Sequence, residues 1–196
     1  MEANNEQDHN FFKEIVKASI IALIIVIPVR FFVAQPYIVS GASMDTTFAD
    51  GHYIIVDQLT YRFNEPERGD VVVFKFPNDP NKFFIKRILG LPGETVVIDG
   101  GELLIANSPT STEGFILPQP FVDEERKTEE NVRRVLQDDE YFVMGDNRRA
   151  SSDSRVWGPL NEEFIVGRAF FRVLPVTQVG ILPGDFEYNE LTFIDE

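Results

Sequence analysis

Apolar residues gather in one long run near the start of the chain and in many short runs after it. Residues 1–10 are polar, but residues 18–29 contain no charged side chain and Ser19 as their one polar side chain. An apolar run of this kind is typical of a helix in a lipid bilayer, because a helix on the surface of a soluble domain usually keeps a polar face. We therefore predict a disordered tail over residues 1–10 and a transmembrane anchor over residues 11–35.

The uncharged part of this run is shorter than the roughly 20 residues that cross a bilayer core. The run from Ile15 to Val33 comes close to that length if Lys17 and Arg30 extend toward the two interfaces. Two other interpretations are a cleaved signal peptide and a buried core helix. The first needs a basic start and a small-residue exit, whereas the segment has an acidic lead-in and no such exit. A buried core helix usually carries a polar face, and this stretch offers only Ser19.

Basic residues flank the apolar run unevenly. Lys13 and Lys17 lie at its start, whereas Arg30 lies at its end and is followed by a long gap to Arg62. The positive-inside rule therefore favours an N-terminus in the cytoplasm and a domain on the extracytoplasmic side.

Short runs rich in β-branched and aromatic residues follow the anchor, and turn-forming residues separate them. They predict strands over residues 53–56, 69–76, 95–98, 102–105, 141–144 and 164–174. The tripeptide Asp99-Gly100-Gly101 separates two of these runs and indicates a hairpin, because glycine tolerates positive φ angles. No long amphipathic helix alternates with the runs, so an antiparallel, mostly-β domain is favoured over an α/β domain.

The predicted domain covers residues 36–196 and includes a charged, irregular insertion near residues 118–139, which we expect to be solvated. The whole chain has a formal net charge of −14, which argues against a nucleic-acid partner, because phosphates repel an acidic protein. It contains no cysteine, which excludes a disulfide framework, a thiolate zinc site and a cysteine nucleophile.

A candidate nucleophile lies in the sequence Val-Ser-Gly-Ala-Ser-Met-Asp-Thr-Thr-Phe at residues 39–48. Ser43 follows Gly41 and Ala42, which let a substrate approach the backbone closely, and precedes an apolar methionine. A serine hydroxyl needs a base to become a nucleophile, and this stretch contains no strong base. The partner of Ser43 must therefore come from elsewhere in the chain. For this stretch alone, a structural serine in a turn is the simpler interpretation.

Lys86 is the candidate base. It lies in the sequence Phe-Phe-Ile-Lys-Arg-Ile-Leu at residues 83–89, which predicts a buried strand. Burial disfavours the charged ammonium and lowers its pKa, so a buried lysine becomes a usable base near neutral pH. Strand alternation places Lys86 and Arg87 on opposite faces. From this segment alone, a lysine that faces water at a strand edge remains the alternative.

A third stretch, residues 144–159, is dense in hydrogen-bonding side chains directly after a predicted strand. A hydroxyl such as that of Ser151 could orient a neutral lysine, while Asp153 and Arg155 fix the loop. The alternative is an ordinary polar loop held by Asp–Arg pairs.

These stretches occur in the order found in bacterial type I signal peptidases, which the chain resembles over about residues 11–175. The resemblance rests on four motifs: Ser-Gly-x-Ser-Met-x-x-Thr at 40–47, Arg-Gly-Asp-Val-Val-Val-Phe at 68–74, Lys86-Arg87 with Gly-Leu-Pro-Gly-Glu at 90–94, and Gly-Asp-Asn-Arg at 145–148 with Ser151, Asp153, Ser154 and Arg155. An apolar anchor ahead of the first motif fits the same family. Four motifs in order are far more specific than any one of them.

The resemblance implies a membrane-bound serine endopeptidase that removes N-terminal signal peptides from exported preproteins through a serine–lysine dyad. It implies an antiparallel β-sheet catalytic domain of signal-peptidase type, held on the extracytoplasmic side of the plasma membrane by a single-pass anchor. The implied partners are preprotein signal peptides with small residues at positions −1 and −3, and the lipid bilayer, but no nucleic acid. Neither a metal nor a cofactor is implied.

Residue by residue, Ser43 matches the nucleophile of this family and Lys86 matches its general base. Ser151 matches the serine that orients the lysine. The oxyanion hole corresponds to the backbone amide of Ser43 with the group at Gly41, where some family members carry a serine side chain. The positions that brace the site are Arg87, Asp146, Asp153 and Arg155, and those that line the shallow substrate pockets are Val39, Met44, Phe48, Phe84 and Ile85.

The chain departs from the family at Thr46, where the family usually has proline. Proline there stiffens the turn after the nucleophile. Its replacement removes no proton-transfer group, so the resemblance still implies an active enzyme.

Two other functions remain open from the sequence. One is a specialised serine–lysine processing peptidase of the pilus or conjugation type. A self-cleaving repressor is another serine–lysine protease on a similar β-fold, but it would need a DNA-binding head in place of the apolar anchor. The other is an inactive, membrane-tethered β-domain that binds exported segments. Only Thr46 favours that second function, and the presence of both Ser43 and Lys86 argues against it.

Overall fold

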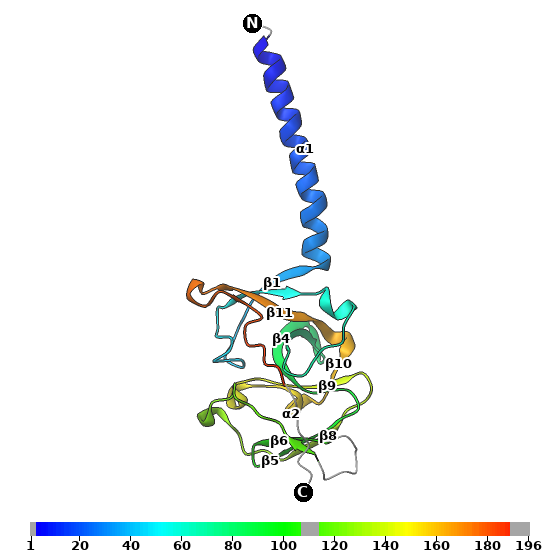
Figure 1. Cartoon of the computed structure of the whole chain (residues 1–196), viewed down its shortest axis with the longest axis vertical. Helices are drawn as coiled ribbons and strands as arrows, with labels where there is room; N and C mark the ends of the chain where they lie inside the picture. The colour runs from blue at the N-terminus through cyan, green and yellow to red at the C-terminus, as the bar shows by residue number, and fades with distance from the viewer. Residues whose placement is uncertain (1–2, 107–113, 189–196) are drawn as a thin grey trace.

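The computed structural model describes residues 3–106 and 114–188. Within these residues, one long helix leads into a domain built from two antiparallel β-sheets. The helix and the smaller sheet lie at opposite ends of the molecule, with the larger sheet between them (Figure 1). The mostly-β, antiparallel fold predicted from the sequence is confirmed.

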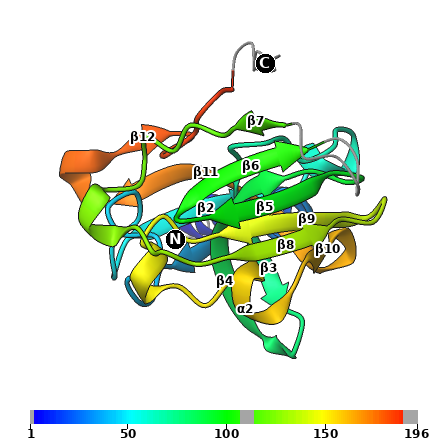
Figure 2. The same cartoon turned by 90° about the horizontal axis from the view of Figure 1, so that it is seen from below.

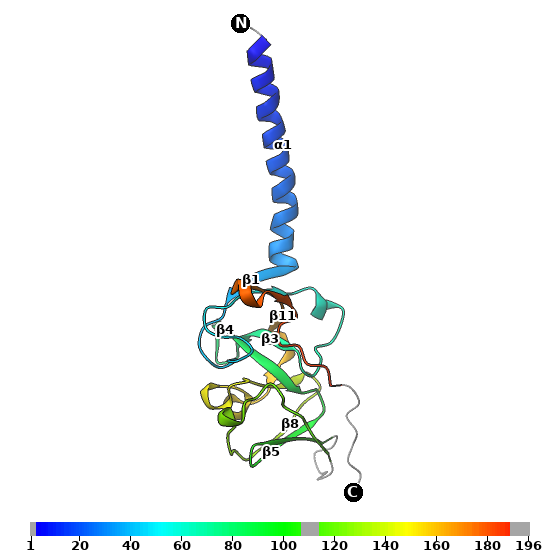
Figure 3. The same cartoon turned by 60° about the vertical axis from the view of Figure 1, so that its left-hand side comes forward.

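Helix α1 spans Ala3–Phe32 and projects away from the β-domain (Figures 1 and 3). A disordered tail was predicted over residues 1–10, but the helix begins at Ala3. Residues 3–17, ahead of the apolar run, contain neither Gly nor Pro, so they can extend a helix that the apolar run forms. Ile20, Leu23 and Ile24 are 52%, 56% and 66% exposed. By length and hydropathy, none of the helices in the described part of the chain qualifies as a membrane span.

The larger sheet contains eight strands among the described residues, in the order β1-β2-β11-β3-β4-β9-β10, with β12 paired to β11. Their bounds are Ala34–Ile38 (β1), Tyr53–Asp57 (β2), Val71–Phe76 (β3), Asp79–Gly90 (β4), Glu140–Met144 (β9), Leu160–Asn161 (β10), Ile165–Leu174 (β11) and Gly180–Ile181 (β12). Strand β4 is paired on both sides, with β3 and with β9. Its C-terminal half is therefore buried within the sheet.

The smaller sheet has the order β7-β6-β5-β8 (Figure 2). Its strands are Thr95–Asp99 (β5), Glu102–Ala106 (β6), Phe115–Ile116 (β7) and Val132–Val135 (β8). Gly100 and Gly101 have φ angles of 54° and 90°, as the predicted hairpin between β5 and β6 requires. Strand β8 lies inside the segment 118–139 that was expected to be irregular. It pairs with the edge of β5, a tertiary contact that its Val-Arg-Arg-Val sequence does not indicate.

Short helices fill the connections between the strands. They are α2 at Ser154–Trp157 and the 3₁₀ turns Thr60–Arg62, Glu124–Arg126, Arg148–Ala150, Glu162–Phe164 and Val176–Gln178. Helix α2 directly follows the loop after β9, and Asp153 caps its start by accepting the Arg155 N–H.

Three apolar clusters form the core. One joins the two sheets and contains Leu89 of β4 with Val96 of β5. The other two lie on opposite faces of the larger sheet, because successive residues of a strand point to opposite sides. Val73 of β3 belongs to the cluster that buries Met44. The next residue, Phe74, belongs to the cluster on the other face.

Candidate active site

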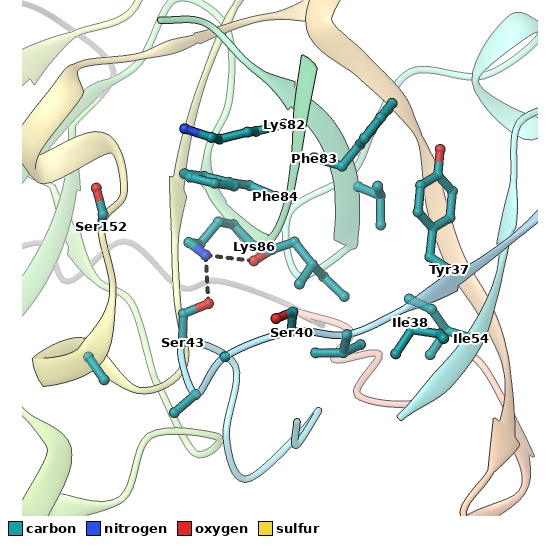
Figure 4. A pocket seen from close by; sticks show the side chains of 16 residues that line it. Tyr37, Ile38, Ser40, Ser43, Ile54, Lys82, Phe83, Phe84, Lys86 and Ser152 are labelled. Atoms are coloured by element: carbon teal, nitrogen blue, oxygen red, sulfur yellow. Dashed lines mark hydrogen bonds between the residues drawn. The ribbon is translucent and has the colours of Figure 1, made fainter. Parts of the chain in front are cut away.

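Ser43 and Lys86 lie 43 residues apart in the sequence and meet in the structure. Ser43 comes from the loop between β1 and β2, and Lys86 comes from the buried half of β4. The Nζ atom of Lys86 donates to the Oγ atom of Ser43 at 2.7 Å and to the carbonyl oxygen of Ile85 at 2.8 Å (Figure 4). The structure thus brings the predicted nucleophile and the predicted base into direct contact.

Lys86 is buried, with 3% of its surface exposed. Burial lowers its pKa from 10.5 to about 8, although the negative charges of Asp153 and Asp146 act in the opposite direction. Among the ion pairs of the described residues, none includes Lys86. A substantial fraction of Lys86 is therefore in the neutral form near neutral pH.

The loop that carries Ser43 is fixed on two sides. Phe48 donates its N–H to the carbonyl of Met44 at 2.7 Å, and both side chains are fully buried in the core. The carbonyl of Ser43 itself accepts the N–H of Asn147 at 3.0 Å. A Cβ atom at Gly145 would lie 2.3 Å from that carbonyl, so only glycine allows the loop after β9 to approach the nucleophile so closely.

The backbone amide of Gly41 has an acceptor within the protein. Its N–H donates to Oδ1 of Asp50 at 2.7 Å, and its φ angle of 91° is one that glycine adopts without strain. This amide was expected to contribute to the oxyanion hole, but here it is directed at a carboxylate. The amide of Ser43 is the other backbone donor that the sequence predicted for this role.

Ser151 has no hydrogen bond to Lys86. Its Oγ atom is buried and has no hydrogen-bond partner among the described residues. It faces the backbone of Gly145, where an added Cβ would lie 2.3 Å from that Oγ. The second contact of the Lys86 amine is instead the carbonyl of Ile85. The structure therefore shows no direct contact through which Ser151 would orient Lys86.

Arg87 and Asp146 form a fully buried ion pair next to Lys86 on β4. Nε and Nη2 of Arg87 donate to the two carboxylate oxygens of Asp146 at 2.9 and 2.7 Å. Asp146 also accepts the hydroxyl of Thr47 at 2.6 Å. Thr47 belongs to the loop of Ser43, Arg87 adjoins Lys86 on β4, and Asp146 follows β9. The pair therefore ties together the three segments that build the site.

Asp153 and Arg155 form a second buried pair, within the loop after β9. Nε and Nη2 of Arg155 donate to the two carboxylate oxygens of Asp153 at 2.8 and 2.9 Å, and Asp153 also accepts the N–H of Gly145 at 3.1 Å. Arg155 reaches Thr128 at 2.9 Å and Glu130 at 3.1 Å. The charged segment 118–139, to which no chemistry was assigned, thus helps to hold this loop.

A groove of about 480 Å³ extends from Ser43 and Lys86 along β1 and β4 (Figure 4). Val39, Phe84 and Ile85, three of the predicted pocket residues, line it. Met44 and Phe48, the other two, are buried in the core instead. The further lining residues are Tyr37, Ile38, Ser40, Gly41, Ala42, Ser43, Ile54, Val73, Lys82, Phe83, Lys86, Ala150 and Ser152.

Several residues of the site were not predicted. Tyr37 and Phe83 lie at the far end of the groove, with ring centroids 5.4 Å apart. Strand alternation was the available signal, because Tyr37 shares a face with Val39 and Phe83 shares one with Ile85. Thr47 ends the Ser-Gly-x-Ser-Met-x-x-Thr motif, but its contact with Asp146 was not predicted, since that partner lies 99 residues away in the sequence.

The chemistry that this arrangement offers is proton transfer between two side chains. The separation of Lys86 Nζ and Ser43 Oγ lies within the range over which a general base takes a proton. Within residues 3–106 and 114–188, no group of His, Asp or Glu side chains is arranged to hold a metal ion.

Over most of its length the chain is similar to signal peptidases. Residues 12–174 match the family model described as signal peptidase, peptidase S26. The chain is 36% identical over 186 residues to a probable signal peptidase I-1 of Synechocystis, covering 91% of this chain and 90% of that protein. It is 34% identical over 188 residues to a signal peptidase I of Bacillus licheniformis, covering 91% and 97%. The crystal structure of a signal peptidase I from Enterococcus faecalis is 26% identical, with a TM-score of 0.45 over 54% of this chain and 97% of that one.

Proposed function

Because the chain belongs to the S26 family of signal peptidases, we propose that Ser43 and Lys86 are the nucleophile and the general base with which it removes signal peptides from preproteins. Family membership makes the chain a serine peptidase of this class. The observation that carries the assignment of the two residues is the 2.7 Å contact between Lys86 Nζ and Ser43 Oγ. The pKa of about 8 that burial gives Lys86 supports it.

In the reactive form Lys86 is neutral, so the hydroxyl of Ser43 donates to the amine. The serine oxygen attacks the scissile carbonyl carbon while its proton passes to Lys86, which gives a tetrahedral oxyanion and an ammonium. The ammonium then protonates the leaving amine, the C–N bond breaks, and Ser43 carries the acyl group. Neutral Lys86 next takes a proton from the water that attacks this ester, and returns it to the serine oxygen as the product acid leaves.

We assign the oxyanion to the backbone amide of Ser43. The amide of Gly41 is held by Asp50 at 2.7 Å, so it can contribute only if that hydrogen bond is exchanged when the substrate binds. One donor placed at a developing oxyanion typically contributes about 3–4 kcal/mol of transition-state stabilisation. The buried pairs Arg87–Asp146 and Asp153–Arg155 brace the loops on which this placement depends.

The groove next to the dyad is proposed to bind the residues just before the cleavage site. Val39, Phe84 and Ile85 give it apolar walls close to the backbone of the Ser43 loop. We propose that these walls accept small side chains at positions −1 and −3 of the signal peptide, as the family membership suggests. A preprotein with Leu in place of Ala at −1 is expected to be cut far more slowly, which gel analysis of the processed product would measure.

We further propose that α1 holds the enzyme at the plasma membrane, with its N-terminus in the cytoplasm and its β-domain on the extracytoplasmic side. The helix projects from the domain, and the large apolar side chains of its middle part are exposed. Lys13 and Lys17, at the start of its apolar run, favour the cytoplasm for the N-terminus. Carbonate extraction should leave the full chain in the membrane fraction and release a variant that lacks residues 3–32. Release of the full chain would contradict the anchor.

Cleavage of a preprotein with an Ala-x-Ala exit, in detergent, tests the assignment of Ser43. The wild type should cut after the second alanine of that exit, and Ser43→Ala should not, because it removes the attacking oxygen. Circular dichroism of both proteins checks that the variant folds.

Full activity of folded Ser43→Ala would overturn the assignment of the nucleophile. An inactive wild type that is folded would instead favour an inactive β-domain that binds exported segments. The experiment therefore separates the two functions in a single comparison.

A further inference from the structure

Residues 182–188, here named the C-terminal strap, lie beyond residue 174, where the match to the family model ends. The strap follows β12, and the N–H of Leu182 donates to the carbonyl of Phe170 on β11 at 2.6 Å. In Figure 3 the strap is the red segment that leaves the larger sheet below β11. It thus begins beside one strand of the larger sheet and continues along the β-domain.

Gly184 is the point at which the strap meets the active-site frame. Its carbonyl accepts a hydrogen bond from Nη1 of Arg87, and Gly69 supplies a second carbonyl to the same nitrogen at 2.8 Å. A Cβ atom at Gly184 would lie 2.1 Å from Cγ2 of Thr47. Thr47 and Arg87 are the two residues that hold Asp146. The strap therefore packs against both residues that hold the carboxylate joining the three segments of the site.

The backbone farther along the strap is equally close to the sheet. A Cβ atom at Gly69 would lie 2.0 Å from the carbonyl oxygen of Phe186. Gly69 has a φ angle of 101° and precedes β3, the strand that pairs with Lys86 through Val72. Glycine at this position allows the strap to lie against the start of β3.

Aromatic side chains fix the end of the strap. The ring of Phe186 packs edge to face against Phe121 and Tyr188, with centroids 5.8 and 4.7 Å away. The guanidinium of Arg87 lies over the ring of Phe121, 3.9 Å from its centre. Tyr188 donates its hydroxyl to the carbonyl of Pro118 at 3.0 Å. The strap therefore contacts Arg87 directly through the carbonyl of Gly184, and indirectly through Phe186, which packs on the Phe121 ring beneath the guanidinium.

From these contacts we infer that the C-terminal strap is a positioning element for catalysis: Gly184 and Phe186 hold Arg87 and Asp146 in register and thereby fix Lys86 against Ser43. This inference rests on the proposed roles of Ser43 and Lys86. A strap that only stabilised the fold would change how much enzyme is folded, but not the rate constants of the folded enzyme. Loosening the frame should instead lower kcat and leave KM nearly unchanged, because no strap residue lines the groove.

The pH dependence gives a second signature. When Arg87 is partly withdrawn, the carboxylate of Asp146 is less neutralised and stabilises the charged form of Lys86, whose pKa it already raises. The midpoint of the pH–rate profile should therefore move upward, toward the ordinary lysine value. This midpoint does not depend on the amount of folded enzyme in the assay.

Gly184→Ala in the full chain is the test, with Gly180→Ala as the matched control. The added methyl group collides with Thr47 at position 184, where the φ angle of 83° also disfavours alanine, whereas position 180 has open space. We expect kcat of Gly184→Ala to fall by on the order of 10- to 100-fold, the usual cost of a small misplacement of catalytic groups. Thr47→Ser removes the colliding Cγ2 but keeps the hydroxyl, so adding it to Gly184→Ala should restore part of kcat.

A pair of chain ends supports the same comparison. A chain that ends at Tyr188 keeps the strap and should retain the kcat and the midpoint of the wild type. A chain that ends at Ile181 lacks the strap and should show the lower kcat and the raised midpoint. Phe186→Ala, which leaves the backbone intact, replaces Gly184→Ala if that variant does not fold.

Wild-type kcat and midpoint in the folded strap variants would overturn the inference, provided that the wild type cuts and Ser43→Ala does not. Loss of Ser43-dependent cleavage in the wild type would instead overturn the proposed function. The two failures are therefore distinguishable.

Discussion

Lys86 and Arg87 are neighbours on β4 and illustrate two ways in which a protein buries a cation. Both are almost completely inaccessible to solvent. The amine of Lys86 donates to two neutral oxygens, the hydroxyl of Ser43 and the carbonyl of Ile85, and its pKa falls to about 8. Arg87 has a carboxylate partner, Asp146, in a two-point contact.

This difference fits the roles proposed for the two residues, a catalytic base for Lys86 and a structural support for Arg87. A lysine that lacks a carboxylate partner gives up its proton near neutral pH and becomes a base. An arginine keeps its charge, so it forms a permanent connection to a carboxylate. Adjacent positions on one strand place the base and its support on opposite faces, and any movement of β4 carries both together.

Removing the base should have the largest effect. Lys86→Met fills the same space without a proton acceptor, so we expect the cleavage rate to fall by roughly 10²- to 10⁴-fold, the usual contribution of a general base. The fold should persist, because a neutral side chain is easier to bury than an ammonium. Preprotein cleavage and thermal unfolding measure the two effects.

Lys75→Met, an exposed lysine on β3, is the matched control and should retain full activity. Cleavage by Lys86→Met at the wild-type rate would remove the base from the mechanism.

Breaking the supporting pair should lower stability more than removing the base does. Asp146→Asn leaves the charge of Arg87 buried without a counter-charge, which typically costs about 3–5 kcal/mol. Urea unfolding should show this loss, and activity should fall with it because the frame of the dyad loosens.

Glu124→Gln is the matched control, since its partner Lys127 is in contact with solvent and exposed pairs contribute little. An Asp146→Asn protein as stable as the wild type would show that Arg87 does not need its carboxylate.

The pH–rate profile distinguishes the two cations without a substitution. In the proposed mechanism only the neutral form of Lys86 is active, so log(kcat/KM) should rise by one unit per pH unit and level off near pH 8. Folding stability follows the same residue with a definite sign. Between about pH 8 and 10.5 the unfolded chain binds the Lys86 proton and the folded chain does not, so this contribution to stability rises with pH. A profile that is flat from pH 6 to 9 contradicts the assigned role.

A smaller effect is expected from the link between the Ser43 loop and the pair. Thr47→Val keeps the shape of the side chain but removes the hydroxyl that donates to Asp146 at 2.6 Å. We expect a loss of about 1–3 kcal/mol in the free energy of unfolding, the usual cost of an unmatched hydrogen bond to a buried charge.

Thr46→Val, at the exposed neighbouring position, is the control and should leave stability unchanged. Equal stability of the two variants would show that the frame does not depend on Thr47.

The smallest effect is expected at Ser151. Its Oγ atom has no hydrogen-bond partner among the described residues, so Ser151→Ala breaks no bond, and kcat should stay within about twofold of the wild type. A loss of tenfold or more, measured with the same preprotein, would mean that Ser151 turns toward Lys86 during the reaction, as the family resemblance implied.

Local sequence patterns predicted the strands well, because period-two alternation and glycine turns act within a few residues. The hairpin of β5 and β6 is the clearest example, since Gly100 and Gly101 alone determine the turn. The two-residue strands β7, β10 and β12 are too short for any periodicity and were not predicted. Strand β8 was missed for a different reason, because its pairing depends on the open edge of β5.

The chemistry of the site was also partly predictable. Motif order pointed to Ser43 and Lys86, and the structure places them in contact. The partners of the supporting residues could not be predicted, because they lie far away in the sequence: Thr47 and Asp146 are 99 residues apart, and Arg87 and Gly184 are 97 apart. The hydrogen bond from the Gly41 amide to Asp50 was not predicted, because this amide was expected to donate to the substrate and not to a side chain of the protein.

The order of synthesis gives the contact between Arg87 and Gly184 a further meaning. Of the hydrogen-bond partners of Arg87, Gly69 is made before it, Asp146 after it and Gly184 last. A growing chain thus contains Ser43 and Lys86 before the last of these partners of Arg87 is made. If the strap positions Arg87 as inferred, the newly made peptidase reaches its full kcat only after Gly184 has been added and has folded onto Arg87.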